Sequence, residues 1–155
     1  MAFRFHSLDE QQFSHLYGLS DEILREKGVI AYIADSKPGY PCRVTLEDVE
    51  QGERLLLLNY KHLPTNSPYR SAHAIFVKDG ASSKTCKPDQ IPEVVSCRLL
   101  SIRAFDGKDM MLDAIVSDEK DLSVKIIELL SKQEVSYLHV HTAKRGCFLA
   151  SVTRD

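Results

Sequence analysis

The sequence lacks the features that mark membrane, secreted and nucleic-acid-binding proteins. No apolar run in its 155 residues approaches the roughly 20 that span a membrane, and the first residues lack the apolar stretch of a signal peptide. The 20 Lys and Arg residues nearly balance the 22 Asp and Glu residues, so the net charge is only -2. Such a balance gives no electrostatic reason to bind nucleic acid or an anionic membrane. We therefore expect a cytoplasmic protein with neither of these partners.

Several common catalytic motifs are also missing. The seven glycines are all ten or more positions apart, which excludes a Walker loop and a dinucleotide-binding fingerprint. The His-Glu-x-x-His, Gly-x-Ser-x-Gly and Cys-x-x-Cys patterns of zinc proteases, hydrolases and redox proteins do not occur either. Any active site must therefore be assembled from residues that are scattered along the chain.

Cysteine is present, but its spacing does not indicate cross-links. The four cysteines are separated by 44, 11 and 50 positions, which matches neither a disulfide-rich miniprotein nor paired zinc knuckles. A chain of this length can also bury enough apolar surface to fold without cross-links. We predict that all four are free thiols: Cys42, Cys86, Cys97 and Cys147.

The hydrophobic pattern predicts one α+β domain over residues 1–155, with a mostly antiparallel sheet of about eight strands and about three helices. Helix caps and glycine stops place the helices at about 8–17, 20–28 and 118–132, and a single helical turn at 45–52. Alternating or continuous apolar runs predict strands at 3–5, 29–34, 55–58, 73–77, 96–105, 110–116, 135–141 and 147–152.

The segment Leu138-His139-Val140-His141 is the sharpest local feature. Alternation along a strand places His139 and His141 on one face, and hairpin pairing of His141 with Cys147 would add a thiol to that face. Imidazole and thiolate ligands suit a divalent metal such as zinc. Two other interpretations remain open: His141 acts in acid-base catalysis, or both histidines are half-buried groups bonded to backbone or water.

The stiff loop Pro38-Gly39-Tyr40-Pro41 leads directly into Cys42 and Arg43. Cys42 is a candidate nucleophile because a neighbouring cation and helix amides favour a thiolate; the alternative is that it is a small buried side chain of the core. Arg43 and Arg70 offer planar guanidinium groups that can grip a carboxylate or phosphate, although solvation at the surface is the alternative. We expect Arg43, Arg70 and His141 to share one concavity.

Two aromatic residues follow the second turn-rich loop of the chain. Tyr69 and His73 flank Arg70 and the start of a predicted strand, so they are further candidates for ligand binding. The alternative is structural: Tyr69 would form an aromatic edge of the core, and His73 would stand at the capped start of the strand.

Several of these segments carry a resemblance to a known family. Residues 38–43, 52–60, 67–70, 138–143 and 146–148 are similar to the family named domain of unknown function 1203, and the resemblance covers nearly the whole chain. It implies a single domain and brings no activity, substrate or catalytic residue with it.

Two functions from different classes are consistent with these residues. The first is an enzyme or metal-binding protein that acts on a small anionic substrate through its Cys, His and Arg side chains. The second is a non-catalytic module that binds a small anionic ligand or a protein partner. They would be separated by whether the loop of Cys42, the segment of Tyr69 and Arg70, and the strand of His139 converge on one pocket.

Overall fold

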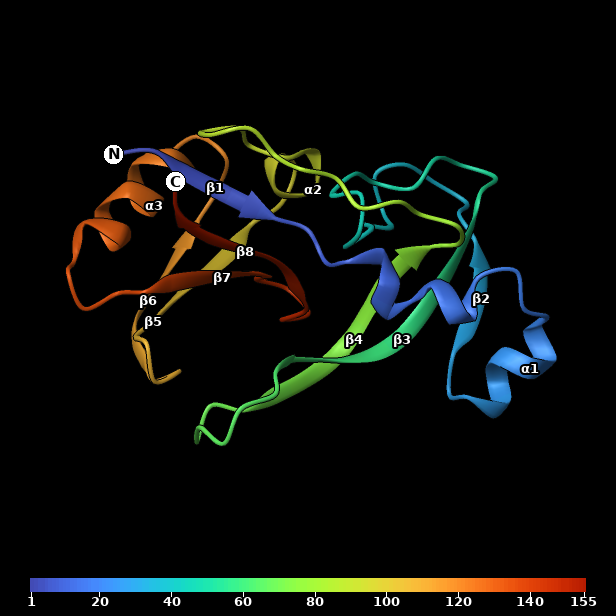
Figure 1. The fold of residues 1–155 in the computed structure, drawn as a ribbon. Helices are drawn as coiled ribbons and strands as arrows, with labels where there is room; N and C mark the ends of the chain where they lie inside the picture. Colours follow the sequence, from blue (N-terminus) through green and yellow to red (C-terminus); the bar gives the residue numbers. More distant parts are fainter.

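The computed structural model describes residues 1–155 and divides eight strands between two antiparallel sheets (Figure 1). The five-stranded sheet has the order β1 (Phe3–His6), β8 (Phe148–Arg154), β7 (Tyr137–Thr142), β5 (Leu100–Phe105) and β6 (Met111–Ser117). The three-stranded sheet has the order β2 (Ile30–Ile33), β3 (Arg54–Leu63) and β4 (Ser71–Lys78). The predicted α+β class and the number of strands are confirmed, but the strands form two sheets and not one.

Three α-helices accompany the sheets, which is the number predicted: α1 (Asp21–Glu26), α2 (Glu93–Ser96) and α3 (Leu122–Ser131). The helices predicted at 20–28 and 118–132 correspond to α1 and α3, whereas α2 was not predicted from the sequence. The Ser20 hydroxyl caps α1 by accepting a hydrogen bond from the Ile23 amide at 3.3 Å. The apolar stripe of α3 is buried against the five-stranded sheet. None of the helices has both the length and the apolar character that crossing a membrane requires.

Each sheet has a hydrophobic core of its own. Nineteen buried residues form the core between α3 and the five-stranded sheet, and 14 form the core of the three-stranded sheet. Ile102 and Val140 point into the first core, so Arg103 and His139, which are adjacent to them and paired in the β5–β7 register, point to the opposite face. Polar side chains of the five-stranded sheet therefore face the junction with the other sheet.

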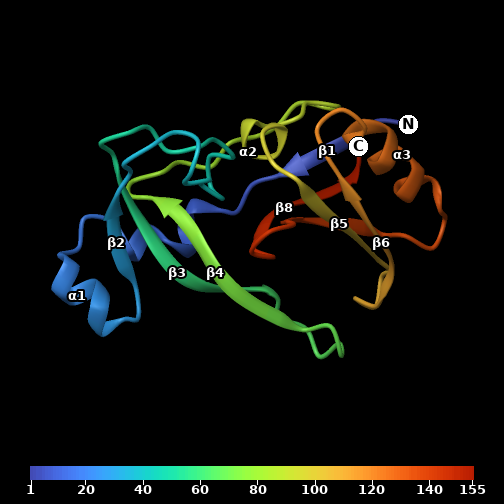
Figure 2. The ribbon, with the colours of Figure 1, turned by 180° about the vertical axis from the view of Figure 1, so that it is seen from behind.

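The long β3–β4 hairpin crosses this junction toward the five-stranded sheet (Figure 2). Ser67 at its tip donates a hydrogen bond to the Asp109 carbonyl in the β5–β6 turn at 2.7 Å. Further along the hairpin, the His62 ring stacks on Phe148 of β8 with 5.5 Å between ring centroids. The two sheets are thus joined by side-chain contacts in addition to the connecting chain.

Two helical predictions are wrong, and both segments make tighter turns. Residues 8–17 form two 3-10 turns, Glu10–Gln12 and Ser14–Leu16, in which the buried Phe13 and Leu16 are three positions apart and fit a three-residue turn. The predicted turn of helix at 45–52 is absent, because Leu46 has a left-handed backbone (φ 55°) and Asp48 pairs with Pro41 in an antiparallel bridge.

Candidate functional site

A cleft of about 800 Å³ opens where the two sheets meet. Its wall on the three-stranded sheet includes Tyr32, His73 and Phe76, and the loop that precedes β3 adds Tyr40 and Arg43. The five-stranded sheet contributes the segment 97–99 before β5 and much of the β7–β8 turn. We call this site the arginine cleft. A second hollow, of about 740 Å³ beside the 3-10 turns, contains none of the predicted site residues.

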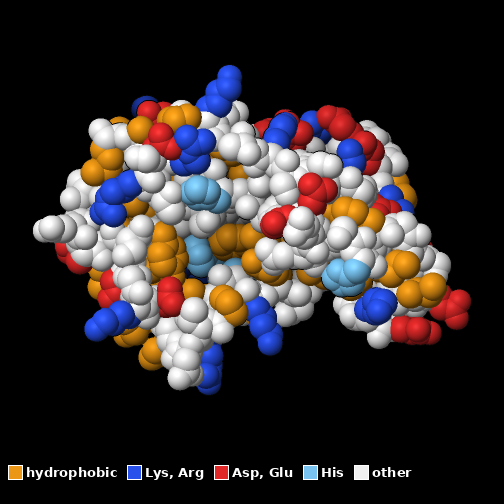
Figure 3. Space-filling model, in the orientation of Figure 1, with side chains coloured by type: hydrophobic (Ala, Val, Ile, Leu, Met, Phe, Trp, Pro, Cys, Tyr) orange, Lys and Arg blue, Asp and Glu red, His pale blue; other side chains and the backbone are white.

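The lining of the arginine cleft is strongly unbalanced in charge. Four cationic side chains line it and no Asp or Glu does, although the whole chain has a net charge of -2. Over the face of the molecule drawn in Figure 3, by contrast, Lys and Arg side chains (blue) and Asp and Glu side chains (red) are interspersed. The cations of the cleft come from three segments of the chain: Arg43, Arg98, Lys144 and Arg145.

Arg43 is held at the base of the cleft and is only 2% exposed. Its Nε donates to the Phe148 carbonyl at 2.7 Å and its Nη1 to the Pro41 carbonyl at 2.6 Å, so it links the two sides of the junction. Burial lowers the pKa of Arg43 to about 10, which still leaves the guanidinium charged at neutral pH. Both hydrogen-bond partners are neutral carbonyls, and Arg43 forms no ion pair of its own. The carboxylate of Asp48 raises the pKa of Arg43 from a distance, but it is already paired with Arg98.

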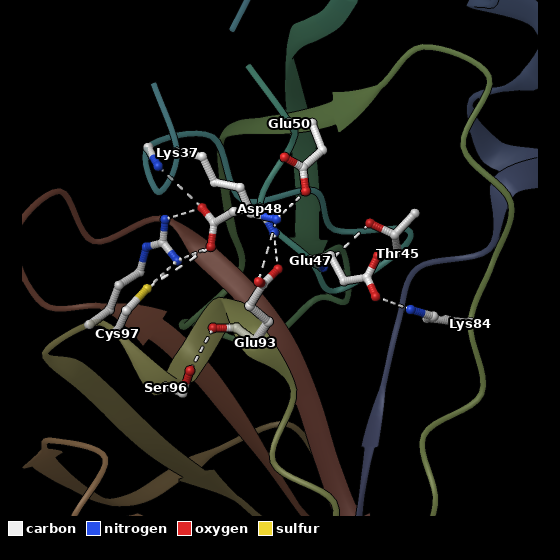
Figure 4. A network of polar contacts seen from close by, with 11 residues as sticks. Lys37, Thr45, Glu47, Asp48, Glu50, Lys84, Glu93, Ser96 and Cys97 are labelled. Atoms are coloured by element: carbon white, nitrogen blue, oxygen red, sulfur yellow. Dashed lines mark hydrogen bonds and ion pairs between the residues drawn. The ribbon is translucent and has the colours of Figure 1, made fainter. Parts of the chain in front are cut away.

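Arg98 is also fixed, but its charge is balanced by Asp48, which Figure 4 shows within a network of polar contacts. Nη2 and Nη1 of Arg98 donate to the two carboxylate oxygens of Asp48 at 2.5 and 2.9 Å, a bidentate pairing. Asp48 is 4% exposed, and its backbone amide donates to Glu93 at 2.9 Å. The surrounding network continues through Lys37, which pairs with Glu50 and Glu93. Arg98 is therefore a rigid wall of the cleft.

Lys144 and Arg145 occupy the exposed β7–β8 turn and take part in no ion pair. The turn itself is ordered: Gly146 takes a left-handed backbone (φ 75°) and donates to the Thr142 carbonyl at 3.0 Å. The Ala143 amide donates to the Leu99 carbonyl at 2.9 Å, which ties the turn to the segment before β5. These two cations are thus available to a ligand in the cleft.

All four cysteines are free thiols, as predicted, and they differ in exposure. Cys97 is exposed, Cys147 is partly exposed, and both line the arginine cleft. Cys86 and Cys42 are buried. Cys42, the predicted nucleophile, is 0% exposed in the core of the three-stranded sheet, where its Sγ accepts from the Lys78 amide at 3.2 Å. The structure therefore places Cys42 in the core and not in the cleft.

Behind the cleft, three histidines pack against one another and against Phe148. Ring centroids lie 4.9 Å apart for His62 and His141, 6.0 Å for His62 and His139, and 6.1 Å for His139 and His141. Burial lowers the pKa of His62 and His139 to about 4 and that of His141 to about 3, so these imidazoles are neutral at pH 7. We call this group the histidine cluster.

The histidine cluster contains unpaired nitrogens. Nδ1 of His62, Nδ1 of His139 and Nε2 of His141 are buried and have no hydrogen-bond partner. His141 uses its other nitrogen, Nδ1, in a 2.9 Å hydrogen bond with the Gly146 carbonyl. The interpretation of half-buried histidines bonded to the backbone is thus correct for one nitrogen of His141.

The predicted pairing of His141 with Cys147 is wrong, because β8 contains a bulge. His139 pairs with Ser151 and Val140 with Ala150, but His141 pairs with Phe148, so Leu149 is the additional residue. The bulge brings Phe148 opposite His141 and leaves Cys147 beyond it, at the cleft. No group of three or more His, Cys, Asp or Glu side chains is arranged to hold a metal ion. The structure therefore does not assemble the three-ligand zinc site.

The predicted concavity of Arg43, Arg70 and His141 does not form either. The cleft includes Arg43, but Arg70 lies on the β3–β4 hairpin, where its recorded side-chain bond is to Asn66, and His141 belongs to the histidine cluster. Tyr69 packs edge-on against Phe105 at 6.4 Å, as its structural interpretation expected. His73 does line the cleft, with Nδ1 3.1 Å from the Ala74 carbonyl.

Sequence reasoning missed most of the cleft: Cys97, Arg98, Lys144 and Arg145 were not candidates. A local signal existed, because Cys97-Arg98 repeats the dipeptide Cys42-Arg43, and two adjacent cations precede Gly146. Asp48, which balances Arg98, had no such signal, because the two are 50 positions apart in sequence.

Comparison with known proteins gives one match. Neither the curated proteins nor the solved structures contain a match to this chain. The model of the family described as "Protein of unknown function (DUF1203)" matches residues 39–154. This range includes every residue that we have discussed in the arginine cleft except Tyr32, and all of the histidine cluster. The chain therefore belongs to the DUF1203 family, as its sequence resemblance predicted.

Proposed function

We propose that the arginine cleft binds a small organic anion through carboxylate or phosphate groups. The observation that carries the proposal is Arg43, a charged side chain only 2% exposed that lines the cleft and has no carboxylate partner. A buried charge is costly unless a countercharge satisfies it. An anionic ligand would supply that countercharge.

The other lining residues fit the same ligand class. Arg98 is held rigidly by Asp48, while Lys144 and Arg145 on the exposed turn can approach an anion from the solvent side. Tyr40 and Phe76 give the cleft an aromatic wall, with 5.3 Å between their ring centroids. A cleft with an apolar wall and a few convergent polar groups is typical of small-molecule sites.

Calorimetric titration with citrate and inorganic phosphate tests the proposal. We expect citrate to bind, and we expect about 1 M NaCl to abolish binding because charges are screened within a few Å at that salt concentration. The double variant Lys144→Gln/Arg145→Gln should weaken citrate binding about fivefold, since each exposed charge contributes a fraction of a kcal/mol.

The matched control is Lys61→Gln/Arg70→Gln, which removes the same net charge outside the cleft. It should leave the affinity for citrate unchanged. Equal weakening by both double variants would mean that only the overall charge matters, and the cleft proposal would then be wrong.

An enzyme acting on such an anion is the second candidate. The observation that favours it is the presence of two accessible thiols, Cys97 and Cys147, in the same cleft.

A reducing compartment such as the cytoplasm suits free thiols at the surface of a cleft, and we propose that location for the protein. Cell fractionation with an antibody to the chain is the direct test.

A further inference from the structure

The two thiols of the arginine cleft have different electrostatic surroundings. Cys97 Sγ lies 3.3 Å from Nη1 of Arg98 but also 4.0 Å from the Asp48 carboxylate, which balances that guanidinium. A negative charge on Cys97 would therefore face a carboxylate as well as a cation.

Cys147 has no carboxylate near it among the residues that line the cleft. The next residue, Phe148, accepts the 2.7 Å hydrogen bond from Arg43 Nε, so the unbalanced guanidinium lies beside Cys147. On the other side, Cys147 follows the turn that carries Lys144 and Arg145.

The backbone holds Cys147 in place at the mouth of the turn. Its amide donates to the Thr142 hydroxyl at 3.1 Å, and its carbonyl accepts from the Thr142 amide at 2.9 Å. The bulge at Leu149 is what turns this residue away from the histidine cluster and into the cleft. Cys147 is thus a positioned, partly exposed thiol between unbalanced cations.

We propose that Cys147 is a thiol-exchange site that selects small disulfides bearing carboxylate groups. The inference rests on the proposed anion-binding function, because the same cations would hold the carboxylates of the reagent. In the reaction, the Cys147 thiolate sulfur bonds to one sulfur of the disulfide and the original S–S bond breaks. The second half leaves as a thiolate and takes a proton from water, so the disulfide itself is the oxidant.

Three small disulfides that differ in charge test the proposal: dithiodiglycolate (anionic), 2-hydroxyethyl disulfide (neutral) and cystamine (cationic). Intact-mass and peptide mass spectrometry would follow mixed-disulfide formation at each cysteine of the reduced protein. We expect dithiodiglycolate to react at Cys147 about tenfold faster than cystamine, because a cleft lined by cations raises the local concentration of anions. About 1 M NaCl should bring the two rates close together.

Variants test whether Cys147 is the residue that reacts with the anionic disulfide. Cys147→Ser should abolish the fast anionic reaction, while Cys97→Ser, the matched control in the same cleft, should leave it unchanged. Lys144→Gln/Arg145→Gln should slow the reaction with dithiodiglycolate and leave that with 2-hydroxyethyl disulfide unchanged. Because the buried Cys42 and Cys86 remain in every variant, their lack of reaction confirms that the protein stays folded.

The outcomes separate this inference from the function on which it rests. Citrate binding together with equal rates for the three disulfides at Cys147 would overturn the exchange site and leave the anion cleft standing. Faster reaction at Cys97 than at Cys147 would overturn it as well. Loss of both citrate binding and charge selection would refute the cleft proposal together with the inference.

Discussion

The arginine cleft and the histidine cluster lie at the same junction between the two sheets, yet burial leaves the ionisable side chain charged in the cleft and neutral in the cluster. In the cleft, Arg43 stays charged although it is buried, because burial lowers its pKa only to about 10. In the cluster, His139 and His141 are equally buried, but burial lowers their pKa values until they are neutral.

The intrinsic pKa of each side chain explains the contrast. A guanidinium titrates so far above neutrality that a lowering to about 10 changes nothing at pH 7. An imidazole titrates near 6.5, so desolvation, with the positive charge of Arg103 as a further cause, is enough to keep it neutral at pH 7. Burial therefore produced a fixed cation in one region and a neutral aromatic cluster in the other. The cluster joins the sheets, whereas the cleft leaves charge available to a ligand.

Low pH should protonate the histidine cluster, so that both regions carry buried positive charge. We expect the resulting loss of stability to be the largest of the effects predicted here. The folded-state pKa values of about 4 for His62, 4 for His139 and 3 for His141 lie below the ordinary 6.5. At a pH between the folded and the ordinary values, the unfolded chain therefore binds more protons than the folded chain. The contribution of the neutral histidines is complete above pH 6.5 and is lost as the pH falls toward 4. We expect a loss on the order of 3 kcal/mol over this range, measured by urea unfolding.

Variants separate the cluster from other groups that titrate. His62→Phe removes one of the three imidazoles and should flatten the dependence between pH 6.5 and 5, above the range where most carboxylates titrate. The exposed His15→Gln is the control and should leave the profile unaltered. An unfolding free energy that stays constant from pH 7 to 5 would contradict the assignment of neutral histidines.

Replacement of Arg43 tests what the buried cation of the cleft contributes to stability. Arg43→Met keeps an apolar stem but leaves the carbonyls of Pro41 and Phe148 without their donors. We expect the free energy of unfolding to fall by about 2 to 3 kcal/mol, because buried acceptors lose their partners. Thermal unfolding checks this, and Arg70→Met, at an exposed position, should change stability by less than about 0.5 kcal/mol. Similar losses in both variants would show that Arg43 does not hold the junction.

Removal of the charge on Asp48 should have the smallest effect on stability and an opposite effect on binding. Asp48→Asn keeps the shape of the side chain but ends the charge balance of Arg98. We expect a stability loss of about 1 to 2 kcal/mol, together with a several-fold tighter binding of citrate, as a second guanidinium becomes unbalanced. Calorimetry on the same preparation measures both. Weaker citrate binding in this variant would mean that the rigid position of Arg98 matters more than its charge.

Elements with local signals could be predicted from the sequence. Helix α3 follows from the apolar positions Leu122, Ile126 and Leu129, and the β5–β6 hairpin from alternation on both sides of Asp106-Gly107. The free thiols follow from the cysteine spacing, and His139 and His141 do share a face. Each of these inferences depends on residues close together in the chain, or on composition, which the sequence displays directly.

Which of these residues come into contact depends on the folded chain as a whole. The cleft cations come from three distant segments, and His62 joins the cluster from the other sheet. One bulge residue, Leu149, moves Phe148 into the cluster and Cys147 into the cleft, because a one-residue shift changes which side chains lie opposite each other. No periodicity in the sequence predicts such a shift, because it depends on how β7 and β8 pair in the folded sheet.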